Sequence, residues 1–300
     1  MRKTKVSIIG SGFVGSTAAN FLAGKDICDI VLVDVIEGVP QGKALDILES
    51  APIIGFNSKV IGTNDYKDTE NSDIVVITAG VARKPGMSRE DLLGINAKIM
   101  FFAVKDVIKY SPNAIIIVVS NPLDAMVYIA KKVSGLKKNN VIGMAGVLDS
   151  ARFKTFISLE TGISSKNINA IVLGGHGDDM VPLSRLANIA GVPIVELLSE
   201  EKIKKIEDRT RNGGAEIVNY LKTGSAYFAP AASIVLMVES IILDKKAVLP
   251  AAAWLEGEYG YENMFMGVPV VLGKDGVEKI IELKLTPNEK LALDKTAKNV

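Results

Sequence analysis

Two runs of apolar residues in the first half of the chain constrain the fold more than any other feature. They are Asp73–Thr78 (DIVVIT) and Ala114–Val119 (AIIIVV), and neither alternates polar with apolar residues. A strand that is apolar on both faces lies inside a parallel sheet that is covered by helices on both sides. The two runs therefore predict a doubly wound parallel sheet, an α/β (Rossmann) domain.

Strands and helices alternate around these runs, as such a domain requires. Further strand candidates are Lys5–Ile9, Ile30–Val33 and Lys59–Ile61. The apolar residues follow helical periodicity over about 13–22, 41–49 and 90–109.

The pattern changes after about Val147. The remaining chain predicts helices at 149–161, 200–221 and 230–243, antiparallel strands at 247–256 and 264–272, and a C-terminal helix that begins with a capping box at Thr286. We therefore expect residues 1–147 to form the doubly wound domain and residues 148–300 to form a second, α+β domain.

A glycine-rich turn follows the first predicted strand and opens the first helix. It reads Gly10-Ser11-Gly12-Phe13-Val14-Gly15. Glycines at these positions permit a tight turn, close approach of a pyrophosphate and close helix–strand packing, while the helix N-terminus attracts the phosphates. Asp34 ends the second strand, where a carboxylate binds the adenosine ribose and repels the additional phosphate of NADP. The combination predicts NAD as the cofactor, against the alternative of a purely structural turn.

The chain has a single histidine, His176. It lies between glycines in the segment GGHGD, directly after a predicted strand at 170–173. Histidine is suited to taking up and returning a proton near neutral pH, and glycines on both sides allow a substrate to approach closely. We therefore expect a general acid/base here, against the alternative of a turn histidine without a role.

Two arginines, Arg83 and Arg89, lie in the polar segment after the strand 73–78. In an open parallel sheet, ligands bind outside the carboxyl ends of the strands, where this segment begins. Because arginine binds carboxylates through two parallel hydrogen bonds, the pair suits an anionic substrate. A solvated basic loop is the alternative.

Three more residues lie at positions that suit a site. Asn121 follows the strand 114–119 and is therefore expected at the carboxyl edge of the sheet. Asp149 and Arg152 lie three residues apart in a predicted helix, so they share a face. From the local sequence alone, an intrahelical ion pair is the simpler interpretation of this spacing.

The composition excludes several classes of protein. Lys plus Arg is 35 and Asp plus Glu is 34, for a net charge of +1, which argues against a nucleic-acid-binding or membrane-surface protein. A single cysteine, Cys28, permits no internal disulfide and no cysteine-rich metal cage. We therefore expect a cytoplasmic protein without a bound metal, and we interpret the apolar segment 225–243 as a buried core helix.

Taken together, these motifs resemble the lactate/malate dehydrogenase family over essentially the whole chain, in particular its lactate-dehydrogenase-like malate dehydrogenase group. The resemblance is carried by GSGFVG at 10–15, Asp34, ARKPGMSRED at 82–91, VSNPLD at 119–124, GVLDSARF at 146–153 and GGHGDDMVP at 174–182. It implies an NAD-dependent oxidoreductase that converts (S)-malate and oxaloacetate in the tricarboxylic acid cycle.

The resemblance also implies roles for individual residues. His176 would accept the proton and Asp149 would orient it. Arg152 would bind the carboxylate beside the reacting carbon, and Arg89 would polarise the carbonyl oxygen. Arg83 would bind the second carboxylate and so select malate. Further contacts would come from residues that touch the reacting oxygen or the cofactor: Asn121, Asn96, Val119 and Ser120.

Other functions are compatible with parts of this pattern. A lactate or other 2-hydroxyacid dehydrogenase is the main alternative, and Arg83 argues against it. NAD-dependent glycosidases need a metal, usually held by Cys and His, whereas Cys28 and His176 lie in unrelated predicted elements. A non-catalytic NAD sensor would not need His176, Arg89 and Arg152 together. The family resemblance also implies a homodimer or a homotetramer.

Overall fold

The computed structural model describes residues 3–82 and 88–300, and this chain divides into two compact units. Unit 1 consists of Met1–Met144, Tyr227–Ala247 and Val271–Lys279. Unit 2 consists of Ala145–Ala226, Val248–Val270 and Ile280–Val300. Unit 1 therefore includes two segments from the second half of the chain, whereas the sequence pattern predicts one boundary after residue 147.

Parallel strands form the central sheet of unit 1, in the order β6-β5-β4-β1-β2-β3. Their bounds are β1 (Lys5–Ile9), β2 (Asp29–Val33), β3 (Val60–Thr63), β4 (Ile74–Ile77), β5 (Ile115–Val118) and β6 (Val141–Gly143). Every residue of β4 and β5 is buried. The doubly wound sheet predicted from the two apolar runs is thus confirmed.

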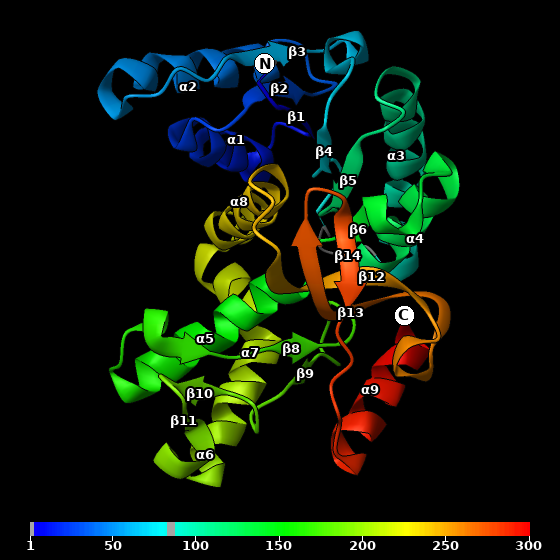
Figure 1. The fold of residues 1–300 in the computed structure, drawn as a ribbon. Helices are drawn as coiled ribbons and strands as arrows, with labels where there is room; N and C mark the ends of the chain where they lie inside the picture. The colour runs from blue at the N-terminus through cyan, green and yellow to red at the C-terminus, as the bar shows by residue number, and fades with distance from the viewer. Residues whose placement is uncertain (1–2, 83–87) are drawn as a thin grey trace. The chain divides into compact units, whose positions relative to one another are not determined.

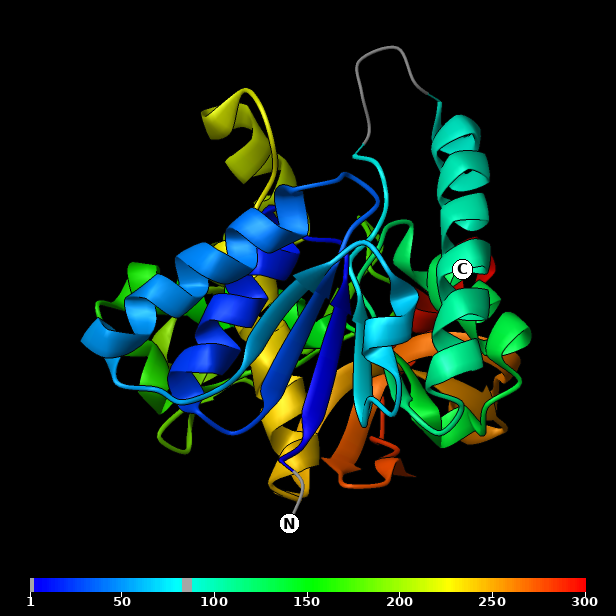
Figure 2. The same ribbon diagram turned by 90° about the horizontal axis from the view of Figure 1, so that it is seen from above.

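Helices cover both faces of this sheet. They are α1 (Phe13–Lys25), α2 (Val39–Ile54), α3 (Arg89–Tyr110), α4 (Leu123–Ser134) and α8 (Phe228–Ile242), with short 3-10 helices η1 (Tyr66–Thr69) and η2 (Lys138–Asn140). Figure 2 shows α1 and α2, in blue, on one side of the strands and α3, in blue-green, on the other. Helix α4 packs against α3.

Helix α8 explains why a late segment belongs to unit 1, since it packs along α1 (Figure 1). Its buried residues include Pro230, Ile234 and Met237, so the predicted core helix is confirmed and begins two residues earlier than Pro230. Within the described residues, none of the helices combines the length and the apolar character needed to cross a membrane. The short strand β14 (Gly276–Ile280) completes the elements of this unit.

Unit 2 is built on two long helices, α5 (Gly146–Thr161) and α7 (Glu200–Leu221), which pack against each other. Phe153 and Ile157 of α5 share a buried apolar cluster with Ile203 and Ile206 of α7. The other helices are α6 (Ile194–Leu197), α9 (Pro287–Asn299), η3 (Ser165–Asn167) and η4 (Glu258–Gly260). Helix α9 begins with the predicted capping box, in which Thr286 and Glu289 bond to each other's backbone amides.

The strands of unit 2 are mostly short. They are β7 (Ile168–Asn169), β8 (Val172–Leu173), β9 (Val181–Pro182), β10 (Asn188–Ile189), β11 (Val192–Pro193) and most of β12 (Ala247–Glu256) and β13 (Glu262–Gly273), whose residues 247 and 271–273 belong to unit 1. Strand β10 pairs antiparallel with β7 and β11, and β8 pairs antiparallel with β9. The strand predicted at 170–173 is therefore shorter than expected and consists of Val172 and Leu173.

Candidate active site

The glycine-rich turn of unit 1 has a backbone that side chains would disrupt. Gly10 has φ of +103°, and a Cβ built on it lies 2.8 Å from the amide nitrogen of Ala79. A Cβ on Gly15 would lie 1.9 Å from the carbonyl oxygen of Gly10. Thr78 at the end of β4 donates its hydroxyl to that same oxygen at 2.9 Å. Thr78 is absent from the sequence-predicted site, although its position at the end of a predicted strand could have indicated it.

Helix α1 begins immediately after this turn, with Gly12 as its N-cap residue. A Cβ built on Gly12 meets no atom of the described residues within 4 Å. The space beside Gly12 is thus open, and the partial positive charge of a helix N-terminus attracts an anion. Phe13 is exposed and Val14 is half-buried in the first turn of the same helix. This cradle of glycines and amides fits the pyrophosphate of a dinucleotide.

Asp34 is fixed beside the turn at the carboxyl end of β2. Its Oδ2 accepts hydrogen bonds from the Ser11 amide at 2.8 Å and the Ser11 hydroxyl at 3.3 Å, and its Oδ1 accepts from the Ile36 amide at 3.1 Å. The carboxylate therefore keeps one position relative to the glycine-rich turn. A negative charge held here fits the ribose of NAD and disfavours the phosphorylated ribose of NADP.

Asn96 joins the segments that follow β4 and β5. Its side-chain oxygen accepts from the Val81 amide at 2.8 Å, and its side-chain nitrogen donates to the Asn121 carbonyl at 2.6 Å. Ser120 donates its hydroxyl to the Ala79 carbonyl at 2.6 Å, and the Val119 amide bonds to Ile77. These residues thus set the backbone at the carboxyl edge of the sheet, where the Asn121 side chain is exposed.

The two arginines predicted on the loop are described unequally. Arg83 lies outside the described residues, and for Arg89 the structure describes the backbone at the first position of α3. That position is set by a capping box, in which Ser88 and Asp91 each accept a hydrogen bond from the other's amide. Hydrogen bonds from the Ser88 hydroxyl and amide lower the pKa of Asp91, so this carboxylate stays charged beside the helix N-terminus.

Three of the predicted site residues meet in unit 2. Asp149 is buried in the first turn of α5, and its Oδ2 lies 2.9 Å from Nδ1 of His176. Its Oδ1 accepts from Nη1 of Arg152 at 3.3 Å. The ion pair expected from the local sequence and the orienting contact implied by the family resemblance are therefore both present, on different oxygens of one carboxylate.

The contact with Asp149 determines which nitrogen of the imidazole carries the proton. With a carboxylate at Nδ1, the neutral ring carries its proton on that nitrogen and a lone pair on Nε2. A ring held in this way is able to accept a proton at Nε2 and return it. Arg152 supplies a fixed positive charge on the same carboxylate, so a general base and an anion-binding group are held together.

The glycines around His176 have a role beyond open access. Gly174 has φ of +94° and forms an antiparallel bridge with Gly267, whose Cβ would lie 2.4 Å from the Gly174 carbonyl oxygen. The Gly175 amide donates to the Thr296 hydroxyl at 3.1 Å. The histidine segment is thus clamped by tight backbone packing from two other parts of unit 2. Gly267 and Thr296 were not predicted from the sequence, because their contribution depends on long-range packing.

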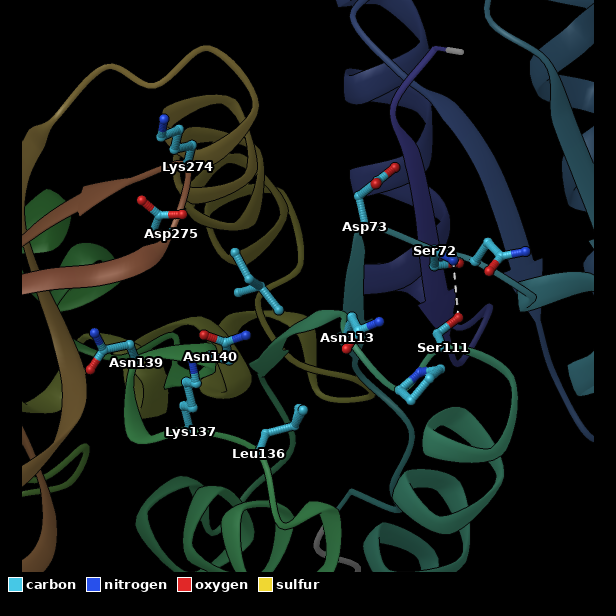
Figure 3. Close-up of a pocket in the computed structure, with 13 residues that line it drawn as sticks. Ser72, Asp73, Ser111, Asn113, Leu136, Lys137, Asn139, Asn140, Lys274 and Asp275 are labelled. Atoms are coloured by element: carbon cyan, nitrogen blue, oxygen red, sulfur yellow. Dashed lines mark hydrogen bonds between the residues drawn. The ribbon is translucent and has the colours of Figure 1, made fainter.

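A separate pocket of about 740 Å³ lies at the other edge of the unit 1 sheet (Figure 3). Ser72 and Asp73 precede β4, and Asn113 precedes β5, so this pocket is at the amino ends of the strands. The Ser72 amide donates to the Ser111 hydroxyl at 3.0 Å, and Asp275 lies across the pocket from Asp73. Because ligands of doubly wound sheets bind at the carboxyl ends, this pocket is not the candidate active site.

Comparisons with known proteins identify the family of the chain. Residues 4–143 match the family described as lactate/malate dehydrogenase, NAD binding domain, and residues 146–300 match its alpha/beta C-terminal domain. The malate dehydrogenase of Heliobacterium modesticaldum is 57% identical over 300 residues, which cover 100% of this chain and 97% of that protein.

Solved structures give the same result. The malate dehydrogenase of Cryptosporidium parvum is 47% identical with a TM-score of 0.97, covering 100% of this chain and 96% of that one. The lactate dehydrogenase of the same organism, in complex with lactic acid and NAD, is 46% identical with a TM-score of 0.97 and the same coverage. By sequence and by structure, the chain belongs to the lactate/malate dehydrogenase family.

Proposed function

We propose that this protein is an NAD-dependent malate dehydrogenase, which interconverts (S)-malate and oxaloacetate. The observation that carries the proposal is the buried Asp149 carboxylate, which bonds to His176 at 2.9 Å and to Arg152 at 3.3 Å. Relatives named malate dehydrogenase that are 56–57% identical over the full chain support the same activity. NAD, when bound, supplies the nicotinamide ring that takes up or returns the hydride.

In the proposed oxidation, His176 accepts the hydroxyl proton of malate at Nε2. Asp149 holds the ring through Nδ1 and stabilises the imidazolium that forms. Arg152 binds the carboxylate next to the reacting carbon. In the reverse direction, the imidazolium returns the proton to the oxygen of oxaloacetate, which is a general acid/base role worth about 10²- to 10⁴-fold in rate.

The other proposed contacts come from unit 1. Gly10–Gly15 and Asp34 would bind the pyrophosphate and ribose of NAD, with Asn96, Val119 and Ser120 as further cofactor contacts. Asn121 would bind the reacting oxygen, and Arg89 would polarise it. The pyrophosphate and ribose contacts are supported by the open space at Gly12 before the N-terminus of α1 and by the fixed Asp34 carboxylate.

The choice of malate over lactate rests on Arg83, which would bind the second carboxylate of the substrate. A methyl group in that position, as in pyruvate, would leave a guanidinium desolvated and unpaired, at a cost of about 2–5 kcal/mol. A lactate dehydrogenase is the second candidate, because solved lactate dehydrogenases are also close neighbours of this chain.

One experiment separates these functions. NADH absorbance is followed after addition of oxaloacetate and, in parallel, of pyruvate. A malate dehydrogenase consumes NADH with oxaloacetate at a kcat/KM at least about 30-fold above that with pyruvate, from the free-energy cost given above. A preference for pyruvate would establish the lactate reaction, and no NADH consumption with either acid would refute both functions.

The wider setting follows from the same proposal. We propose a cytoplasmic homodimer or homotetramer that serves the tricarboxylic acid cycle, with residues 1–147 as NAD-binding domain and residues 148–300 as catalytic domain. Exposed apolar side chains on α2, among them Leu45 and Ile53, support self-association. Light scattering coupled to size-exclusion chromatography measures the oligomeric state.

A further inference from the structure

Helix α7 contains two adjacent glycines, Gly213 and Gly214, in its interior. Glycine is unfavourable at such positions relative to alanine, because it has more conformational freedom to lose. Both glycines lie where α7 packs against α5, the helix that carries Asp149 and Arg152. We therefore expect a neighbouring side chain that leaves no space for a Cβ at these two positions.

This neighbour is the side chain of Arg152. A Cβ built on Gly213 lies 3.1 Å from Cδ of Arg152 and 3.5 Å from its Nε. A Cβ built on Gly214 lies 3.4 Å from Nη2 of the same arginine. The guanidinium group and its stem therefore lie directly on the bare backbone of α7. The Arg152 side chain is 14% exposed, so little of its position is left to solvent.

A second feature prevents the neighbours from yielding to an added methyl group. The Cβ on Gly213 would also lie 3.4 Å from Cε2 of Phe156, whose ring is covered by the Arg209 guanidinium at 4.4 Å from the ring centroid. Arg209 is itself held by two hydrogen bonds to Glu216, at 2.9 and 2.8 Å. Because the contact with Arg152 is the shorter of the two and the ring of Phe156 is covered by Arg209, we expect Arg152 to be the group that moves.

We propose that Gly213 and Gly214 are positioning residues for the substrate carboxylate, because they give the Arg152 guanidinium the space it needs on α7 while its Nη1 reaches Asp149. The proposal rests on the role of Arg152 in the proposed function. Substitution of these glycines should therefore weaken substrate binding selectively. A displaced guanidinium loses its alignment with the substrate carboxylate, whereas the cofactor-binding residues of unit 1 are unchanged.

The test compares alanine substitutions of helix glycines. In Gly213→Ala, the KM for oxaloacetate is expected to rise roughly 3- to 10-fold, because a contact at 3.1 Å displaces the Arg152 side chain by less than the roughly 1 Å that costs about 100-fold. In Gly214→Ala, a smaller rise is expected, because 3.4 Å is close to ordinary contact. The KM for NADH should stay at the wild-type value in both variants.

Gly42→Ala in α2 is the matched control. Gly42 is also a helical glycine, and its built Cβ meets no atom of the described residues within 4 Å. This variant should keep the wild-type KM for oxaloacetate and gain thermal stability, as alanine favours helices. A merely structural glycine pair would behave like Gly42, with a higher Tm and an unchanged KM, and that result at position 213 would overturn the proposal.

A double variant tests the steric cause. Adding Phe156→Leu to Gly213→Ala removes ring atoms that confine the new methyl group, so the KM for oxaloacetate should recover part of its loss. No recovery would show that the methyl group does not act through this contact. The activity of the wild type with oxaloacetate is measured first, and its absence would refute the proposed function. The variants are compared only with an active wild type, so their results test the role of the two glycines alone.

Discussion

Oδ2 of Asp149 lies 2.9 Å from Nδ1 of His176, and the Asp149 residue is only 1% exposed. The electrostatic interaction of a buried carboxylate with adjacent groups is stronger than it would be in water, and salt screens it only weakly. The contact therefore determines the orientation of the imidazole and leaves Nε2 as the nitrogen that we propose takes up the proton.

Replacement of the imidazole is expected to abolish proton transfer while sparing the cofactor site. His176→Asn should lower kcat by about 100-fold or more, which is the ordinary contribution of a general acid/base. The dissociation constant for NADH, measured by fluorescence titration, should stay unchanged because the glycine-rich turn lies in unit 1. A fully active variant would rule out His176 as the base.

Removal of the Asp149 charge should damage the same step. Asp149→Asn keeps the size of the side chain, but the imidazolium loses its stabilising carboxylate and Arg152 loses its ion-pair partner. We expect kcat to fall on the order of 100-fold. Because the two residues act as a unit, the double variant with His176→Asn should be little worse than His176→Asn alone. Multiplicative losses would show that the two side chains act independently.

Substrate choice is expected to depend on Arg83. In Arg83→Gln, binding of pyruvate would no longer leave a guanidinium without a carboxylate partner, so the ratio of kcat/KM for oxaloacetate to that for pyruvate should fall. A cost of about 2–5 kcal/mol corresponds to a change of roughly 30-fold to several-thousand-fold. Steady-state kinetics with both acids measure this ratio, and an unchanged ratio would remove Arg83 from substrate recognition.

The parts of the fold with a local cause could be predicted from sequence. Strands β4 and β5 are buried on both faces, so polar and apolar residues do not alternate along them. The start of α9 is marked by the capping box, which is contained in the four residues from Thr286 to Glu289. The strands from β7 to β11 have two residues each, which is too short for any periodicity. Likewise β6 and α4 are not among the predicted elements.

The same division applies to the site. Asp34 and the glycine-rich turn form a local signature, and the ion pair of Asp149 with Arg152 follows from helical spacing. The contact of Asp149 with His176 joins two elements that are 27 residues apart, so only the family resemblance implied it. Gly213 lies against Arg152 because α7 packs on α5, and a local sequence pattern does not predict this packing.

Cofactor choice is expected to depend on the charge of Asp34. Asp34→Asn keeps an oxygen that accepts the Ser11 amide hydrogen bond but removes the charge that repels the ribose phosphate of NADPH. The ratio of kcat/KM for NADPH to that for NADH should rise by about 10-fold or more, because juxtaposed like charges cost several kcal/mol. If the ratio stayed constant, the carboxylate would have only a structural role in the turn.

Asp26 should make the stability of the protein depend on acidic pH. It caps α1 with φ of 53°, and its Oδ1 accepts hydrogen bonds from the Lys3 ammonium at 2.7 Å and from the Asn57 amide at 3.1 Å. The hydrogen bond from Lys3 is the largest cause that lowers the pKa of Asp26 from 3.8 to about 2. Because the folded pKa is lowered, this stabilisation is present above the unfolded value and is lost as the pH falls through the folded one.

The variant Asp26→Asn isolates this charge, since asparagine tolerates the left-handed backbone of the cap. The wild type should resist urea better than Asp26→Asn at neutral pH, and the difference between their unfolding midpoints should shrink between about pH 4 and pH 2. Asp46→Asn, at an exposed position of α2, is the control for the loss of one surface carboxylate. A difference for Asp26→Asn that persists at the lowest pH at which both proteins fold would show that the side chain acts through its shape and not through its charge.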